Sequence, residues 1–579
     1  MEERSSETLE TPPPTDRKER SPPARERLGP GGEAVLAALA LAALYLLLRT
    51  SPYLAIGAFH DDGVYLAVGK ALADGEGYRS LYAVGEPVHA KYPPGLPALY
   101  ALLWGFLPDL ASVHRAALLL SLVTSSLAAG VLWWLARARM ALSAPIALFF
   151  VVGPFLLEAS VQYFNLAATE PYFILLWGVA LVLFHALAAR ERRAESGGTS
   201  PATLAVLLGA VAAGAVLFRS QGIVLVPAIA LAMLVPRVTR RSFALYASTA
   251  VLPVAAWRIW HRIALLEGPV GTQPDEGAYV SWTPSGTPPE MVRFIIDVFR
   301  SQVRMYGTYM PPHLSSVWSI GLGIWLLLLA VAVAGSLRSW RRHPDLVLTA
   351  WTSAAIVFLW PWWQDRFVVS LLPFLGLIAA VAVEDWMGVG SARRRRLTLG
   401  VLAVVSAVLA FRQVEIRRTV LTAEGARELF FHPAAYLPSN TRYLLAASRW
   451  MALNTPEGAD VVAPHPVGIW LYTGRQVVNA TPALPDVGPS VWDVPGRFLA
   501  QRVVEDDPDF LALWALNERF AQDVSVVQRA CPEALEYLGF TREYTRVAFY
   551  RIHAEDPCFQ ERFLAAARAE LEREEAERR

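Results

Sequence analysis

The sequence predicts a mainly α-helical polytopic membrane protein that crosses the bilayer about eleven times and carries a small α/β domain at its C-terminal end. Of its 579 residues, 54% are hydrophobic and only 18% are charged, against about 25% charged in soluble globular proteins. The apolar residues are concentrated in runs long enough to cross a bilayer. Clusters of arginine follow every second run, which is the arrangement expected of a chain that crosses a membrane repeatedly.

The composition also excludes several classes of protein. The 52 Lys and Arg residues nearly cancel the 51 Asp and Glu residues, so the formal net charge is +1. No basic surplus therefore indicates a nucleic acid as partner. Two cysteines in the whole chain exclude a disulfide scaffold, and the apolar excess excludes a soluble single domain and a disordered protein. The partner that the composition indicates directly is the lipid bilayer.

The transmembrane domain is predicted over residues 31–412. Residues 1–30 mix Pro, Glu and Arg without apolar periodicity, which indicates a disordered cytosolic tail rather than a cleavable signal peptide. The two short runs on either side of Arg219 fit either two crossings or a re-entrant pair. The apolar runs lie at 33–51, 113–136, 142–161, 168–189, 202–218, 222–236, 242–260, 315–337, 345–361, 367–386 and 397–412.

The arginines predict the orientation, because basic residues are retained on the cytoplasmic side. The five clusters that follow even-numbered runs are Arg137 with Arg139, Arg190 with Arg192 and Arg193, Arg237 with Arg240 and Arg241, Arg338 with Arg341 and Arg342, and Arg393 to Arg396. The N-terminus is therefore expected inside and everything after about residue 413 outside. The bias to Arg over Lys and to Ala indicates a GC-rich bacterial source, which favours an inner membrane.

Three outer segments are longer than simple connectors. The loop 52–112 contains two amphipathic stretches, DDGVYLAVGKALADG and PGLPALYALLWGFL, which predict juxtamembrane helices. The loop 261–313 is rich in Gly, Pro and Ser, which predicts a mobile segment, either a lid or a plain connector. Residues 413–579 alternate helical patterns with short strand patterns, which predicts an extracytoplasmic α/β domain. Cys531 and Cys558 both lie there, either bonded to each other or as two free buried thiols.

Charged residues at the outer ends of membrane helices are candidates for function, because charges near the bilayer are costly. Asp61 and Asp62 begin the first juxtamembrane stretch, where they are either a helix cap or a catalytic base. Lys91 is one of only three lysines in the chain. It either binds a phosphate as a point charge or extends to the lipid headgroups.

The other candidates lie at the ends of later helices. Glu170 in ATEP is either functional or part of a helix cap. Arg219 and Arg366 lie where the positive-inside rule would not place them, so each needs an anionic partner such as a phosphate. Asp365 is a competing partner for Arg366. All of these groups converge on the outer face, which indicates transfer from a lipid phosphate.

These residues resemble those of a known family. Asp61-Asp62, then YPPG, ATEP, FRSQG and RFVVSLLPFLGLIAA resemble in order and spacing the membrane-embedded GT-C glycosyltransferases, over about residues 50–412. The similarity is greatest to the protein mannosyltransferase and aminoarabinose transferase branch and its bacterial relatives. The stretch from WMALNTPEG also resembles the opening of the small outer domain in many bacterial members.

The resemblance implies an inverting transfer of a sugar from a polyprenyl-phosphate donor to a hydroxyl of a glycan, lipid or protein acceptor. It implies that Asp61 is the base and Asp62 its helper, although many relatives have Asp-Glu, so their division of labour stays open. Glu170 would be the second acidic motif. Lys91 and Arg366 resemble the ligands of the donor phosphate, and Arg219 is a looser match.

Two alternatives remain on the sequence alone. Some GT-C relatives need a divalent metal, but no DxD occurs at these positions, so we expect a reaction without metal or other cofactor. A transporter or flippase of lipid-linked sugars would also be polytopic and would also bind phosphate. Such a protein is expected to show an internal repeat or broken helices at the bilayer midplane, and no repeat is found in the sequence.

Overall fold

The computed structural model describes most of the chain. The predicted tail lies almost wholly outside the described residues, as do parts of the longer loops. The described residues are 29–48, 56–57, 61–89, 91–164, 166–193, 199–236, 238–267, 287–314, 318–359, 365–388, 392–422, 439–464, 466–479, 496–514, 518–541 and 547–578.

Each of the predicted apolar runs forms helix over most of the residues that the structure describes. The run 142–161 is the least regular, with a π-helical turn at Leu148–Val152 and a 3-10 turn at Gly153–Leu156. The helices of the bundle are α1 (Pro30–Leu48), α4 (Leu110–Trp134), α5 (Ala144–Ala147), α6 (Glu158–Phe164), α7 (Glu170–Arg193), α8 (Pro201–Phe218), α9 (Leu225–Leu234), α10 (Arg240–Glu267), α13 (Trp318–Ser339), α14 (Pro344–Leu359), α15 (Asp365–Val369), α16 (Leu372–Gly388) and α17 (Ala392–Thr422).

Membrane crossing is supported for some of these helices by length and composition. Within the described residues, those that are long and apolar enough to cross a bilayer are Leu110–Arg139, Glu170–Arg192, Pro201–Phe218, Arg240–Ala264 and Ser319–Ser339. Shorter apolar helices include α1, α9 and α14. These helices are consistent with a multi-pass membrane protein, while the number of eleven crossings and the orientation stay predictions.

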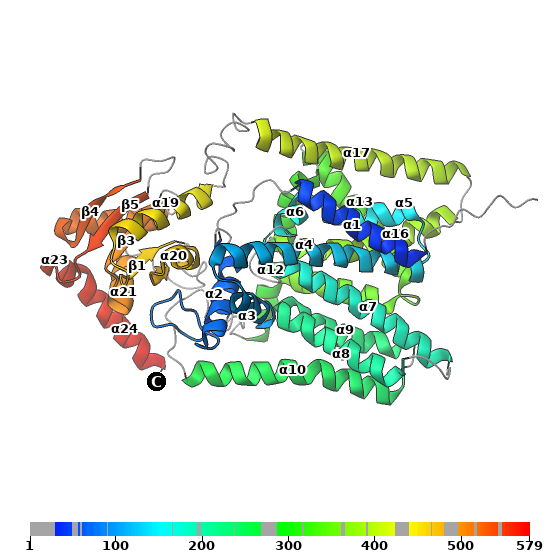
Figure 1. The fold of residues 1–579 in the computed structure, drawn as a ribbon, viewed down its shortest axis with the longest axis horizontal. Coiled ribbons are helices and arrows are strands. Elements are labelled where there is room, and N and C mark those ends of the chain that lie inside the picture. The colour runs from blue at the N-terminus through cyan, green and yellow to red at the C-terminus, as the bar shows by residue number, and fades with distance from the viewer. Residues whose placement is uncertain are drawn as a thin grey trace, which may run out of the picture.

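One row of the bundle consists of α1, α4, α7, α8 and α10, each of which packs against the next (Figure 1). Local sequence explains where α8 begins: Pro201 occupies the first turn, and the Ser200 hydroxyl accepts the Thr203 N–H at 3.1 Å. The end of α8 matters for the site. Arg219 is extended there, and a 3-10 turn at Ser220–Val224 reverses the chain into α9. A side chain at Gly222 would lie 2.5 Å from the Ala215 carbonyl oxygen, so only glycine fits this reversal.

The first outer loop forms the predicted helices, α2 (Asp61–Asp74) and α3 (Gly95–Phe106), which pack against each other. Figure 1 shows both of them between the helical bundle and the C-terminal sheet. Residues at the start of α2 and in the segment before α3 therefore lie at the junction of the two parts of the molecule.

The prediction of a mobile segment over 261–313 is wrong for its second half. Helix α12 spans Pro288–Leu314 and packs on α13 and α14. Its start is a capping box, in which Glu290 accepts the Thr287 N–H at 2.7 Å and the Thr287 hydroxyl at 2.9 Å. Gln302 and Tyr306 are buried on its inner face. The start of the segment, 261–267, is also helical, because α10 extends to Glu267, and residues 268–286 lie outside the described residues.

The C-terminal part is the predicted small α/β domain. Strands β1 (Val461–Ala463), β2 (Val477–Asn479), β3 (Phe510–Trp514), β4 (Leu535–Phe540) and β5 (Val547–Ile552) form one sheet in the order β2-β1-β3-β5-β4. Strand β1 is parallel to β2 and β3, whereas β5 is antiparallel to its neighbours. The helices of this part are α19 (Ser439–Asn454), α20 (Pro466–Thr473), α21 (Arg497–Asp506), α22 (Glu518–Ala530), α23 (Pro557–Phe559) and α24 (Ala565–Arg578).

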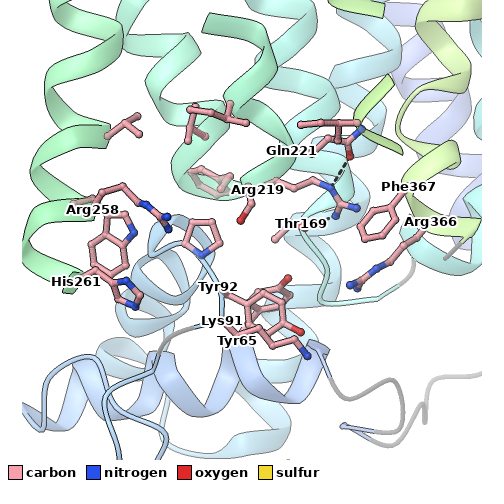
Figure 2. Close-up of a pocket in the computed structure, with 18 of the residues that line it drawn as sticks. Tyr65, Lys91, Tyr92, Thr169, Arg219, Gln221, Arg258, His261, Arg366 and Phe367 are labelled. Atoms are coloured by element: carbon pink, nitrogen blue, oxygen red, sulfur yellow. Dashed lines mark hydrogen bonds between the residues drawn. The ribbon is translucent and has the colours of Figure 1, made fainter. Parts of the chain in front are cut away.

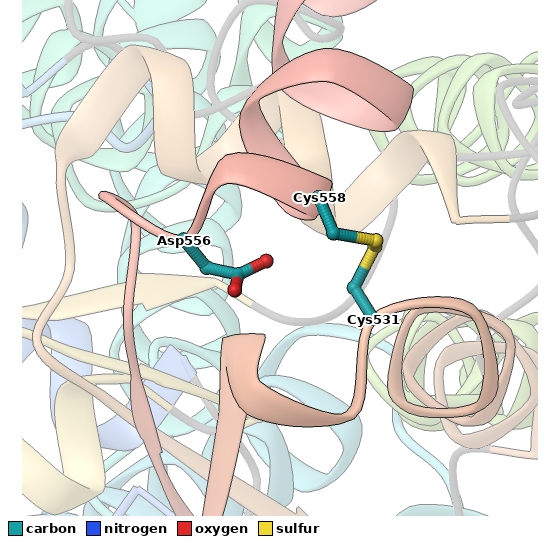
Figure 3. A group of neighbouring side chains, drawn as sticks. All are labelled: Cys531, Asp556 and Cys558. Atoms are coloured by element: carbon teal, nitrogen blue, oxygen red, sulfur yellow. A yellow bond between two sulfur atoms is a disulfide. The ribbon is translucent and has the colours of Figure 1, made fainter.

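Cys531 and Cys558 form a disulfide, which decides between the two alternatives that the sequence left open. The bond joins the end of α22 to α23, with a Cα–Cα distance of 5.6 Å (Figure 3). The neighbouring Asp556 accepts the Phe559 N–H at 2.8 Å and so begins α23. Cys531 is buried in the same apolar cluster as Phe559 and Leu564, and Cys558 packs against this cluster.

Candidate functional site

The predicted site residues lie in one cluster at the junction between the bundle and the outer loop. They come from elements far apart in the sequence: the start of α2, the segment before α3, the start of α7, the turn after α8, and α15. Five of them are connected by contacts of 3.9 Å or less, namely Asp61, Lys91, Glu170, Arg219 and Arg366, and Asp62 adjoins Asp61.

Asp61 is the anion on which three of the surrounding groups converge. Its Oδ2 forms an ion pair with Arg366, and its Oδ1 accepts the Tyr92 hydroxyl. The Lys91 ammonium lies 3.9 Å from Oδ1. Asp61 is also in the first turn of α2, where the helix dipole favours a negative charge. Two cations, a phenol and a helix terminus thus stabilise this side chain as a carboxylate.

Asp62 has a different environment from its neighbour. It is buried, and its Oδ2 accepts the Gly57 backbone N–H at 3.0 Å. Its other oxygen has no hydrogen-bond partner within the described structure. Burial raises the pKa of the Asp62 carboxyl to about 6, although the Gly57 N–H acts in the opposite direction. The pair therefore divides into one carboxylate among cations and one in an apolar setting.

Glu170 is fully buried and holds two arginines together. Its Oε1 accepts a hydrogen bond from Arg219 Nη1 at 2.7 Å and lies 3.7 Å from Arg366 Nε. Arg219 also donates to Thr169 Oγ1 at 2.8 Å and to Gln221 Oε1 at 3.2 Å, and the latter bond is drawn in Figure 2. The competing partner of Arg366, Asp365, has its side chain outside the described part of the chain.

Phe367 adds an aromatic ring between these cations. The Arg219 guanidinium carbon lies 5.1 Å from the ring centroid, and that of Arg366 lies 5.5 Å from it. Cation–π attraction to this half-buried ring favours both charges. The two arginines are therefore fixed by a carboxylate and a ring together, before any ligand binds.

A cavity of about 390 Å³ opens beside this cluster. Its polar end is formed by Lys91, Tyr92, Thr169, Arg219 and Arg366 (Figure 2). The rest of its wall is largely apolar and comes from α8, the turn after it, α10 and α14. This wall includes Val216, Phe218, Ile223, Val254, Trp257, Ile356 and Val357.

Arg258 and His261 of α10 line the side of the cavity across from Arg219 and Arg366 (Figure 2). The His261 Nε2 lies 3.2 Å from the His89 carbonyl oxygen, which ties α10 to the first outer loop. Arg258 is exposed at the rim and forms no ion pair with any of the described residues. Sequence reasoning missed both side chains. Arg258 lies within the apolar run 242–260, and His261 is the first residue of the loop that is predicted to follow this run.

The cavity is positively charged overall. Four cationic side chains line it, namely Lys91, Arg219, Arg258 and Arg366, whereas two carboxylates, Asp61 and Glu170, contact them. The formal excess is two positive charges beside an apolar wall. Such a site suits an anionic headgroup attached to a hydrocarbon chain.

Among the described residues, the carboxylates of this cluster do not come together as a group of three possible metal ligands. Asp61 and Glu170 are already neutralised by arginines, and Asp62 faces Gly57. Within the described residues, the one grouping of three possible ligands at suitable distances is Cys531, Asp556 and Cys558, and both of its sulfurs are consumed by the disulfide.

No protein-family model matches the chain, and no curated protein matches it. Several solved structures match the chain in fold. A structure of ArnT from Cupriavidus metallidurans, bound to undecaprenyl phosphate, matches 89% of this chain and 97% of its own with a TM-score of 0.51 at 14% identity. A structure of the Archaeoglobus fulgidus oligosaccharyltransferase, tethered to an acceptor peptide, matches 90% of this chain and 74% of its own with a TM-score of 0.50 at 11% identity. At these identities the likeness establishes the fold and leaves the activity to be argued from the site.

Proposed function

We propose that this chain, which has the fold of the GT-C glycosyltransferases, moves a sugar from a polyprenyl-phosphate donor to an acceptor hydroxyl on the outer face of a membrane. The observation that carries the proposal is Asp61, a carboxylate held by Arg366 and Lys91 at the polar end of a cavity with an apolar wall. The ArnT structure holds undecaprenyl phosphate, which is a lipid of this chemistry.

The cations of the site have two different tasks in this proposal. Arg219 and Arg366 already have carboxylate partners, so they form a fixed positive wall. Arg258 is exposed at the rim of the cavity, and Lys91 adds a further positive charge to its polar end. Arg258 is therefore the group best placed to close on a donor phosphate, while the prenyl chain lies along the apolar wall.

The reaction requires a base and a stabilised leaving group. The Asp61 carboxylate accepts the proton of the acceptor hydroxyl, the hydroxyl oxygen forms a bond to the anomeric carbon, and the bond from that carbon to the phosphate oxygen breaks. The electron pair stays on the phosphate, which leaves as polyprenyl phosphate, and attack from the opposite side inverts the anomeric carbon.

The ion pair between Asp61 and Arg366 couples these events. When Asp61 takes up the proton it becomes neutral, and Arg366 loses one of its two counter-ions. Its positive charge then becomes available to the phosphate at the moment when the phosphate gains negative charge. Glu170 stays buried behind both arginines and keeps them in position, which assigns it a positioning task rather than contact with the sugar.

A transporter of lipid-linked sugars is less well supported by the geometry. Transporters place their ionisable groups near the middle of broken helices. In this chain both carboxylates of the charge network and one of its arginines lie at helix ends: Asp61 and Glu170 begin α2 and α7, and Arg219 follows the last residue of α8. The acceptor stays open between a glycan, a lipid and a protein hydroxyl.

The test is sugar transfer by the purified protein in lipid vesicles. The donors are radiolabelled polyprenyl-phosphate sugars, and the acceptor is a membrane extract from a strain that lacks the protein. We expect transfer by the wild type and a loss of about 100-fold or more in Asp61→Asn, a typical effect of losing a general base. Asp74→Asn is the matched control, because Asp74 is on the same helix and pairs with Lys70 at the surface. Equal activity of the two variants would contradict the assignment of the base.

A further inference from the structure

The C-terminal domain reaches into the core of the first outer loop. Helix α20 packs against α2, and Figure 1 shows the two side by side at the junction. Val467 is fully buried, and it belongs to the same apolar cluster as Ile56 and Val64, about 400 positions earlier in the chain. The domain is thus packed onto the segment that carries the acidic pair.

Three glycines make this contact close. A Cβ on Gly57 would lie 2.6 Å from the Gly468 Cα, and a Cβ on Gly63 would lie 2.8 Å from the Gly57 Cα. A Cβ on Gly468 would lie 2.6 Å from Leu444 Cδ2 and 3.1 Å from the Ile56 carbonyl oxygen. Backbone from α20, from residues 56–57 and from α2 therefore meets with no space for a side chain between them.

Two hydrogen bonds continue this contact to the acidic pair. The Ile56 N–H donates to the Tyr472 hydroxyl of α20 at 2.9 Å. The next N–H along the chain, that of Gly57, donates to Asp62 Oδ2 at 3.0 Å. One dipeptide therefore connects the hydroxyl of Tyr472 to the carboxylate beside Asp61.

We infer that helix α20 positions the acidic pair for catalysis, and that Tyr472 and Gly468 are positioning residues of the transfer reaction. The inference rests on the proposed function. The Tyr472 hydroxyl accepts the Ile56 N–H, and its side chain is 37% exposed. The C-terminal domain is then a part of the active site's framework and not only an attached module.

The expected sign of a pH effect follows from the groups around Asp62. The Gly57 N–H stabilises the carboxylate, whereas burial and the negative charge of Asp61 oppose it, and Tyr472 faces it from α20. If the Tyr472 hydroxyl is removed, residues 56–57 are held less firmly and the Gly57 bond weakens. The pKa of Asp62 then rises above its present value, so the carboxylate is lost at a higher pH as the solution is acidified.

The test compares Tyr472→Phe and Gly468→Ala with two controls in the same domain. Tyr537→Phe removes a hydroxyl from a residue that is 50% exposed, and Gly458→Ala adds a Cβ where no atom lies within 4 Å. The measurements are kcat and KM for the donor between pH 5 and 8, and hydrogen–deuterium exchange of residues 56–66. We expect Tyr472→Phe to move the acid limb up by about half a pH unit, and so to lower kcat about twofold at pH 6 with KM unchanged.

Exchange of residues 56–66 should be faster in Tyr472→Phe and Gly468→Ala and unchanged in both controls. An unchanged acid limb together with unchanged exchange in folded Tyr472→Phe would overturn the inference. An absence of transfer by the wild type would overturn the proposed function instead. In that case faster exchange would still support the contact between α20 and residues 56–57, and unchanged exchange would refute it.

Discussion

Replacement of Glu170 by glutamine tests the buried charge network most severely. Glu170 has no exposed surface, and its Oε1 lies 2.7 Å from Arg219 Nη1 and 3.7 Å from Arg366 Nε. The amide keeps the volume and one hydrogen-bond acceptor but removes the counter-charge. Breaking a buried ion pair by removing one partner costs about 3–5 kcal/mol. Because the amide oxygen still accepts one hydrogen bond, we expect a loss of about 2–4 kcal/mol in the free energy of unfolding.

The assay is reversible unfolding in mixed micelles with increasing denaturing detergent. Glu191→Gln is the matched control on the same helix, since Glu191 accepts from the hydroxyls of Thr239 and Ser242, and an amide oxygen also accepts such bonds. The double variant Glu170→Gln with Arg219→Gln measures the coupling between the two side chains, expected at about 1–3 kcal/mol. A loss below about 0.5 kcal/mol in Glu170→Gln with no coupling would refute the account of these arginines as a fixed, carboxylate-held wall.

Three further predictions concern other parts of the molecule. Asp62→Asn should stabilise the protein at pH 8 by up to about 2–3 kcal/mol and should not stabilise it at pH 4. Burial raises the pKa of Asp62 in the folded protein to about 6, so the wild type loses stability as the pH rises toward and through 6 and this carboxyl ionises. Equal effects at both pH values in the same unfolding assay would contradict the burial of this carboxylate. Arg258→Ala should weaken binding of undecaprenyl phosphate about 10-fold in a vesicle-binding assay, whereas Arg262→Ala on the same helix should not, and equal effects would remove Arg258 from the site. Reduction of the Cys531–Cys558 disulfide, whose cysteines are 27 positions apart, should lower the free energy of unfolding of the C-terminal domain by about 3 kcal/mol. The loss should be seen as faster hydrogen–deuterium exchange in α22 and α24. Unchanged exchange would show that the bond does not stabilise the domain.

The convergence of the site was predictable from the sequence. Asp61, Glu170 and Arg219 each lie at the end of an apolar helix on the same predicted side, and helix ends on one side of a bundle meet. The apolar runs predicted the helices because a chain inside a membrane has no water to bind, so its backbone N–H and C=O groups must hydrogen-bond to each other. The sequence left open which of these charged side chains pair with each other. Nothing local indicates that Arg366 contacts Asp61 and Glu170, because those contacts depend on the packing of α15 against elements far away in the sequence.

The elements that sequence reasoning missed had weaker or hidden signals. Helix α12 begins with a capping box at Thr287 and Glu290, but these residues end a stretch rich in Gly and Pro, so composition outweighed the local signal. Arg258 lies inside an apolar run, although the rule that marked Arg219 as misplaced applies to it as well. The contact of Gly57 with Gly468 has no sequence signal, because a close backbone approach between distant segments exists only in the folded chain.

The central claim is that Asp61, held by Arg366 and Lys91, is the base of a sugar transfer from polyprenyl phosphate. The most direct measurement is mass spectrometry of the donor lipid in vesicles that contain the purified protein and the membrane extract as acceptor. The account predicts that the wild type converts polyprenyl-phosphate sugar to polyprenyl phosphate with the sugar attached to the acceptor through an inverted anomeric bond, and that Asp61→Asn does not. Donor lipid that stays intact with the folded wild type and every sugar supplied, or conversion that Asp61→Asn sustains at the wild-type rate, would contradict it.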